Sequence, residues 1–102
     1  MSKSKLNTGQ IVSTYSVAEV CENNPEFAAF VSKSMRKHIS GDWGDIDPED
    51  KKSNDDGLDG RNPDRIISAY NFQQLPGVSD TKIWIVTEWD RSVTTILFPS
   101  EY

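Results

Sequence analysis

The single histidine, His38, precedes two aspartates, Asp42 and Asp45, across a short glycine-containing stretch. An imidazole beside carboxylates is a common ligand set for zinc, so these three residues are candidate ligands of one structural zinc ion. The alternative is a histidine at a helix end that packs against Trp43 and hydrogen-bonds a nearby carbonyl or carboxylate. Zinc sites usually need at least three protein ligands, and the sequence has no HExxH, no CxxC and no second histidine. These absences favour the alternative.

Acidic residues are concentrated in one segment. Between Gly41 and Gly60 there are eight acidic residues and two lysines, so this segment carries −6 and the remainder +1. The segment does not have the ligand pattern of an EF-hand calcium loop. A loop that begins at Asp45 departs from this pattern after Asp47, and a loop that begins at Asp55 departs from it immediately. The segment is either a solvated acidic face or a phosphate-like patch for a basic groove on a partner. The candidate partner-binding residues are Asp42, Asp45, Asp47, Glu49, Asp50, Asp55, Asp56 and Asp59.

Further charged side chains are concentrated near a predicted hairpin. Glu88 and Asp90 are a candidate carboxylate pair for acid–base chemistry, and Arg91 is a candidate anion ligand. A structural role explains the same residues: the Asp90 side chain caps the turn and pairs with Arg91. We favour this structural role over acid–base chemistry. The one cysteine, Cys21, is expected to face the core from a helix. We therefore expect no catalytic residues and no enzyme activity.

The elements that position these residues follow from local signals. Residues 10–15 are rich in β-branched side chains and predict a strand, and Ser16 opens a capping box for a short helix. Asn24 followed by Pro25 predicts the N-terminus of a longer helix that ends at Gly41. That helix carries an apolar stripe at three- and four-residue spacing: Phe27, Phe30, Val31, Met35, His38 and Ile39.

Downstream, Asp47 and Pro48 predict a third helix over residues 48–56, closed by Gly57. Runs at 66–72, 82–89 and 93–98 predict strands, the middle one central because both of its faces carry apolar residues. The expected fold is α+β, with helices packed on one face of a three- to four-stranded antiparallel sheet in the order β-α-α-α-β-β-β. Residues 1–9 are expected to be a flexible N-terminus and residues 10–102 a single domain.

Composition narrows the class of protein. A chain of 102 residues with 11 basic and 16 acidic residues has a net charge of −5 and a mean hydropathy of −0.60. This acidity argues against direct nucleic-acid binding and favours a basic protein partner. A single cysteine, with no membrane-length apolar run and no signal peptide, predicts a soluble cytoplasmic protein. Trp84 and Phe98 could lie on an exposed sheet face and pair two subunits, but core packing explains them equally well, so we expect a monomer or a weak homodimer.

Three stretches together resemble a known group of proteins. They are HISGDWGD (38–45) with Asn54, RIISAY (65–70), and KIWIVTEWDRSVTTILFPSEY (82–102). The sequence resembles, over roughly residues 10–102, a family of small proteins encoded on bacterial plasmids, phages and integrated elements. Proteins of this broad kind include anti-CRISPR proteins that inhibit type II RNA-guided nucleases. The resemblance provides no catalytic residues to transfer.

The resemblance implies a stoichiometric inhibitor whose partner is a CRISPR effector nuclease of the host bacterium. Such a nuclease binds guide and target in positively charged channels, so the acidic segment would block DNA loading without catalysis. A metal at His38 would then pin the acidic loop to the helix. Two alternatives stay open: a metal-dependent hydrolase of a mobile element, and a non-catalytic interaction module with another partner.

Overall fold

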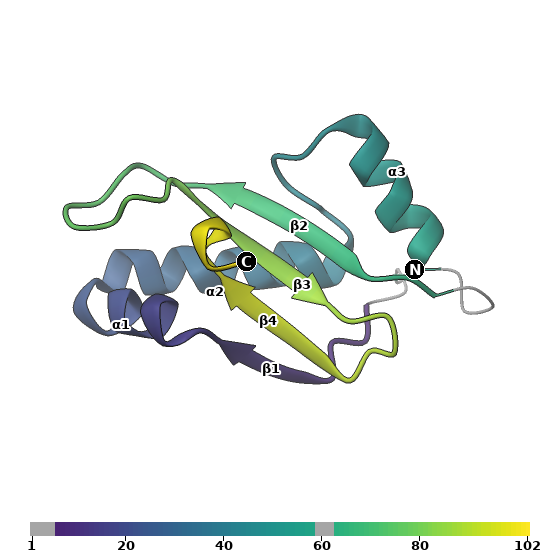
Figure 1. Cartoon of the computed structure of the whole chain (residues 1–102), viewed down its shortest axis with the longest axis horizontal. Coiled ribbons are helices and arrows are strands. Elements are labelled where there is room, and N and C mark those ends of the chain that lie inside the picture. Colours follow the sequence, from purple (N-terminus) through teal and green to yellow (C-terminus); the bar gives the residue numbers. More distant parts are fainter. Residues whose placement is uncertain (1–5, 59–62) are drawn as a thin grey trace.

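The order of helices and strands along the chain follows the predicted β-α-α-α-β-β-β. The computed structural model describes residues 6–58 and 63–102. Its elements are β1 (Gln10–Ser13), α1 (Tyr15–Asn23), α2 (Pro25–Ser40), α3 (Pro48–Gly57), β2 (Ile66–Asn71), β3 (Lys82–Thr87), β4 (Val93–Leu97) and a 3₁₀ helix, η1 (Pro99–Glu101) (Figure 1). The α+β class is confirmed, and η1 is an addition that was not predicted.

The strands form one mixed sheet in the order β1-β4-β3-β2. β3 pairs antiparallel with both β2 and β4, which confirms the prediction of a central strand in this region. β1 instead runs parallel to β4, so the expectation of a purely antiparallel sheet is wrong for this pair. A parallel pair needs a long connection, and the chain between Ser13 and Val93 provides it.

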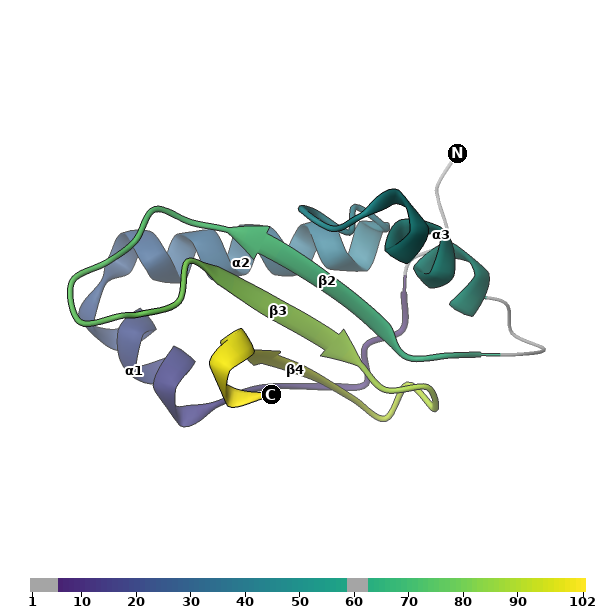
Figure 2. The same cartoon turned by 45° about the horizontal axis from the view of Figure 1, so that its top comes forward.

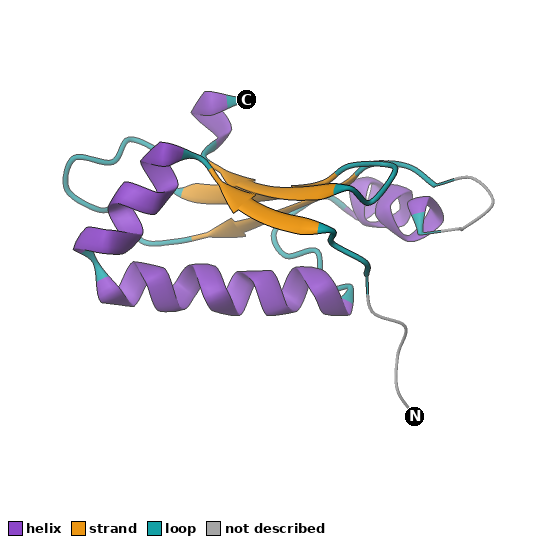
Figure 3. Ribbon diagram, turned by 90° about the horizontal axis from the view of Figure 1, so that it is seen from below, coloured by secondary structure: helices purple, strands orange, loops and turns teal. Residues whose placement is uncertain are grey.

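Alternating side chains give the sheet two different faces. Ile83, Ile85 and Thr87 of β3 are fully buried on the face that α1 and α2 cover, whereas Trp84 points to the opposite face, where η1 lies (Figure 3). The third helix, α3, lies beside the edge strand β2, at the end of the sheet away from α1 (Figures 1 and 2). The main core is formed by Val17, Phe27, Val31, Met35, Tyr70, Ile83, Ile85, Ile96 and Phe98.

Capping residues explain where α1 and α2 begin and end. The Asn24 side chain accepts the amide of Phe27 at 3.0 Å, and Gly41 ends α2 in the left-handed region at φ 89°, as predicted. The first helix begins earlier than predicted, because Thr14 rather than Ser16 is its N-cap. The extended Thr14 accepts the amide of Val17 through its hydroxyl at 3.3 Å, which leaves Ser16 inside the first turn.

The segment before β1 contacts the body of the protein from Leu6 onward. The Leu6 side chain is buried, and its amide donates to the carbonyl of Ile39 at 3.0 Å. Gly9 has φ 59°, and a Cβ added there would lie 2.3 Å from the carbonyl oxygen of Arg91. Only glycine fits this close approach to the β3–β4 turn. Residues 1–5 of the predicted flexible N-terminus lie outside the described residues.

Within residues 6–58 and 63–102, no helix is both long enough and apolar enough to cross a membrane.

Candidate functional site

His38 is fully buried between α2 and the sheet, where hydroxyl groups contact both of its ring nitrogens. Its Nδ1 lies 2.5 Å from Ser68 Oγ, and its Nε2 lies 2.8 Å from Thr87 Oγ1. Thr87 Oγ1 in turn lies 2.7 Å from Thr94 Oγ1, which donates to the carbonyl of Thr8 at 2.8 Å. We call Ser68, His38, Thr87 and Thr94 the buried relay. It joins α2, three strand positions and the N-terminal segment.

The end of the buried relay determines the tautomer of His38. A carbonyl can only accept, so Thr94 uses its single proton on Thr8 and must accept from Thr87. Thr87 therefore has no proton left for the ring, and His38 Nε2 must carry the hydrogen that it donates. Nδ1 is then the acceptor of the Ser68 hydroxyl. Each hydrogen bond of the relay points in one direction, from Ser68 to Thr8.

Burial keeps this imidazole neutral. Loss of solvation lowers the pKa of His38 from 6.5 to about 4. Trp43 packs edge-on against the ring with 5.7 Å between ring centroids, as the structural interpretation of the sequence expected. The hydrogen-bond partners are hydroxyls, however, rather than the expected carbonyl or carboxylate.

The three predicted metal ligands do not come together. Both ring nitrogens of His38 are engaged inside the core, whereas Asp42 and Asp45 are exposed on the loop after α2. Asp42 accepts the Gly44 amide at 3.2 Å. Among the described residues, no group of three or more His, Cys, Asp or Glu side chains is arranged to hold a metal ion. The structure therefore does not assemble the predicted zinc ligands, because the turn at the end of α2 places the two aspartates at the surface.

The loop after α2 instead completes the exposed edge of β2. The Ala69 amide donates to the Trp43 carbonyl at 3.2 Å, and the Asp45 amide donates to the Ala69 carbonyl at 2.7 Å. The Asp45 carboxylate then accepts the Asn71 amide at 3.0 Å. At Gly44, with φ 78°, a Cβ would lie 2.1 Å from the Ala69 carbonyl oxygen, so glycine is required. Asp45 thus occupies the backbone edge that an added strand would use.

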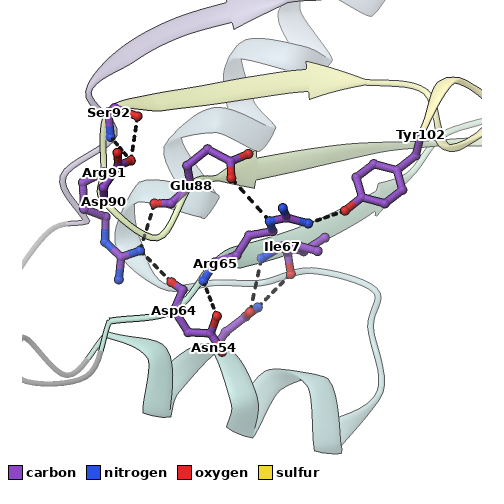
Figure 4. Close-up of polar contacts among 9 residues, drawn as sticks. All are labelled: Asn54, Asp64, Arg65, Ile67, Glu88, Asp90, Arg91, Ser92 and Tyr102. Atoms are coloured by element: carbon purple, nitrogen blue, oxygen red, sulfur yellow. Dashed lines mark hydrogen bonds and ion pairs between the residues drawn. The ribbon is translucent and has the colours of Figure 1, made fainter.

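Asn54 of α3 satisfies the next stretch of the same edge. Its Oδ1 accepts the Ile67 amide at 3.2 Å and its Nδ2 donates to the Ile67 carbonyl at 2.8 Å, the pairing a neighbouring strand would make (Figure 4). The Asn54 side chain is buried, and a second link runs from Trp43 Nε1 to Asp55 Oδ1 at 2.9 Å. Two side-chain contacts therefore hold α3 against the sheet and the loop.

Arg91 fixes the C-terminal end of α3 from the β3–β4 turn. Its guanidinium donates to the carbonyl of Gly57 at 2.7 Å. It also donates to the carbonyls of Asp64 at 2.7 Å and Glu88 at 3.2 Å (Figure 4). Its own backbone has φ 59°, unusual for a side chain with a Cβ. Arg91 is thus bonded to backbone oxygens in the folded protein, and this contradicts the prediction that it pairs with Asp90.

Asp90 caps the turn, which is the structural role that the sequence favoured over acid–base chemistry with Glu88. Its carboxylate accepts the Ser92 amide at 3.1 Å and the Ser92 hydroxyl at 2.6 Å, and these bonds lower the pKa of Asp90. Glu88 lies 3.5 Å from the guanidinium of Arg65, which also bonds the hydroxyl of Tyr102 (Figure 4). Glu88 and Asp90 have separate partners and do not form a catalytic pair.

The predicted acidic segment divides into carboxylates with structural partners and carboxylates that face solvent. Asp42, Asp45 and Asp55 each accept a hydrogen bond within the domain. Asp56 forms an exposed pair with Lys52 at 3.1 Å. Asp59 lies outside the described residues. The other carboxylates on or just before α3, all exposed, are Asp47, Glu49, Asp50 and Asp56.

Sequence reasoning missed the partners of His38 and the roles of Asn54 and Arg65. A usable signal existed for the relay: Ser68, Thr87 and Thr94 occupy core-facing positions of strands, at a period of two from buried isoleucines. No local signal identifies Asn54, because its partner is the backbone of Ile67.

Comparison with protein-family models, curated proteins and solved structures finds no significant match.

Proposed function

We propose that this protein is an anti-CRISPR protein of a mobile element that inhibits a type II RNA-guided nuclease by stoichiometric binding. The observation that carries the proposal is an acidic helix, α3, held against the edge of the sheet with Glu49, Asp50 and Asp56 exposed to solvent. In the host cytoplasm these carboxylates occupy a basic channel of the nuclease and block DNA loading. The family resemblance contributes the class of partner, and the charged helix contributes the mode of binding.

The way in which α3 is held supports a binding role. Asn54 bonds the backbone of β2, Asp55 bonds Trp43, and Arg91 bonds the last carbonyl of the helix. A helix fixed before binding loses little conformational entropy when a partner covers it. Its carboxylates are therefore presented in a constant arrangement, as a mimic of backbone phosphates requires.

Charge supports the class of partner. The chain carries a net charge of −5, and seven of its acidic residues lie between Asp42 and Asp56. A surface of this sign accelerates encounter with a positively charged groove and repels nucleic acid itself. Binding is therefore expected to weaken as salt is added, since screening shortens the range of these interactions to about 8 Å at physiological ionic strength.

The hydrolase alternative has no support from the geometry around His38. A metal ligand or general base needs a ring nitrogen that faces the substrate, and both nitrogens of this buried ring are engaged by hydroxyls. The other alternative, a non-catalytic interaction module with another partner, would use the same acidic helix as the leading proposal. The two differ in the protein that is bound.

The test is titration of target-DNA cleavage by a purified type II guide–nuclease complex, with pull-down of the complex alongside. Inhibition is expected to saturate near one protein per complex. The combined variant Glu49→Gln, Asp50→Asn and Asp56→Asn is expected to weaken inhibition roughly tenfold or more at physiological salt.

The matched control removes the same charge from the other end of the molecule. Glu19, Glu22 and Glu26 are exposed on α1 and the start of α2, away from α3 (Figure 1). Changing all three to glutamine should leave inhibition within about twofold of the parent, since distant charges are screened. Equal losses in both triple variants would contradict a specific role for α3. An absence of binding and inhibition by the parent protein would contradict the proposal for that nuclease.

A further inference from the structure

An apolar groove lies beside the acidic helix, on the face of the sheet opposite α2. It encloses about 330 Å³ between α3 and the C-terminal segment. Its floor is the outer face of β2 and β3, where Ile67, Ala69 and Trp84 lie, and Ile46 and Tyr102 also line it. The small side chain of Ala69, directly opposite Trp84 in the register, helps to leave the space open.

The two aromatic side chains of the groove are exposed enough to make contacts. Trp84 is half-buried, Tyr102 is 63% exposed, and their rings meet edge to face with 5.2 Å between centroids. The hydroxyl of Tyr102 is bonded by Arg65, which in turn pairs with Glu88, so the aromatic wall is held in position (Figure 4). Ordered tryptophan, tyrosine and arginine side chains around an apolar hollow are typical of the centres of protein–protein interfaces.

The charged side chains that line the groove are one arginine, Arg65, and one carboxylate, Asp50. Arg65 and Glu88 largely offset each other at 3.5 Å, which leaves the exposed carboxylate of Asp50 on the α3 side. This carboxylate belongs both to the groove and to the acidic helix. A partner that covers α3 therefore also reaches the groove, and it meets an apolar hollow with an acidic edge.

We infer that the groove between α3 and Tyr102 receives one apolar side chain that a basic protein partner presents next to a lysine or arginine. This inference rests on the proposed function and adds the anchor point to it. A volume of about 330 Å³ is at the small end of binding pockets, which suits a single side chain more than a separate ligand. The neighbouring cation of the partner pairs with Asp50.

The backbone edge of β2 supports a side-chain anchor instead of an added strand. Trp43, Asp45 and Asn54 already satisfy the outward amides of Ile67, Ala69 and Asn71 and the outward carbonyls of Ile67 and Ala69. A partner segment cannot extend the sheet there by backbone pairing. Contact at this end of the protein must therefore use side chains, and the groove is the concave apolar surface that they meet.

The experiment fills the groove from a surface position. Ser53 is exposed on α3 and lines the groove, so Ser53→Phe is expected to occupy it without entering the core. Tyr102→Ala is a second variant, which removes one wall. Calorimetric titration of the purified type II guide–nuclease complex, at low and at physiological salt, should show each variant binding about tenfold more weakly at both salts. Thermal melting verifies that each variant is folded.

Matched controls make the same chemical changes elsewhere. Ser32 is exposed on α2 and Tyr15 is 81% exposed on α1, so Ser32→Phe and Tyr15→Ala should bind like the parent protein. The salt dependence separates the two proposals. Groove variants should keep the parent's salt dependence, whereas the α3 charge variant should reduce it.

Two outcomes would overturn the inference. If the parent protein binds and Ser53→Phe and Tyr102→Ala bind equally well, the groove is not an anchor and the acidic helix alone carries the proposed function. If the parent protein does not bind the nuclease complex, the proposed function fails and the groove proposal fails with it.

Discussion

Two polar regions of this protein differ in how their side chains are used. In the buried relay, Ser68, His38, Thr87 and Thr94 use one another's donors and acceptors in an ordered chain. On α3, polar side chains that face the sheet are bonded, whereas Glu49 and Asp50 face water. A histidine near aspartates is therefore not by itself a site, because function requires polar atoms that the fold has not already engaged.

Removal of the imidazole should have the largest effect on the relay. His38→Ala deletes a fully buried ring, which removes the acceptor of the Ser68 hydroxyl and the donor to Thr87. The loss of packing and of two buried hydrogen bonds is expected to destabilise the fold by about 4 kcal/mol. Urea unfolding followed by fluorescence measures this. A loss below about 1 kcal/mol would show that the relay is not a structural element.

Acid should weaken the relay without any mutation. The pKa of His38 is about 4 in the folded protein against 6.5 when solvated, so between these values the unfolded chain binds a proton that the folded protein does not. This contribution to stability is complete above pH 6.5 and is lost as the pH falls toward 4. It amounts to about 3 kcal/mol.

The pH effect is measured as the urea midpoint at pH 7, 5.5 and 4. Carboxylates also titrate near pH 4, so His38→Gln is the reference that lacks the imidazole. The parent protein should lose stability more steeply than this variant between pH 6.5 and 4. Parallel curves would mean that His38 is protonated in the folded protein as readily as in the unfolded chain.

Detachment of α3 should have a smaller effect than the loss of His38. Asn54→Ala removes both bonds to the Ile67 backbone and exposes part of the β2 edge, for an expected cost of about 2 kcal/mol. Hydrogen exchange should show faster exchange of the Ile67 amide. Asn54→Asp keeps the acceptor but places a buried carboxylate oxygen against the Ile67 carbonyl, so it should cost at least as much as alanine. If both variants match the parent, Asn54 does not hold the helix.

Charge on α3 should matter least for stability. Neutralising Glu49, Asp50 and Asp56 removes exposed carboxylates, one of which pairs with Lys52 at the surface. Exposed pairs and helix-dipole contacts contribute little, so the change in unfolding free energy should stay within about 1 kcal/mol. The same urea titration measures it. A larger loss would mean that these carboxylates support the fold, and it would complicate their use in a binding test.

Sequence reasoning worked where the signal is local. Asn24 with Pro25, and Gly41, define α2 through atoms three or four residues apart, and these predictions are confirmed. It failed for Ser16, because Thr14 offers an equivalent hydroxyl at the better position. It also failed to predict the parallel pairing of β1 with β4, because β-branched residues indicate a strand but not the direction in which it runs.

The candidate site was harder to predict, because proximity along the chain says nothing of direction in space. His38 and Asp42 are four residues apart, yet the left-handed turn at Gly41 places one in the core and the other in water. The partners of His38 lie 30 and 49 residues away. The acidic character of α3 could be read directly, because exposed charge depends on composition more than on folding.

The pairing of β1 with β4 has a consequence for how the molecule assembles. β1 is synthesised before its partner strand, and Gln10 must find Val93 across all of the helices and strands that lie between them. Such a contact closes a long loop and is therefore made late, after local helices and the β3–β4 hairpin. In refolding with pulsed hydrogen–deuterium labelling, the amide of Thr14, which bonds Ile96, should become protected after those of β3. During synthesis β1 thus stays unpaired until every helix and strand between it and β4 has been made.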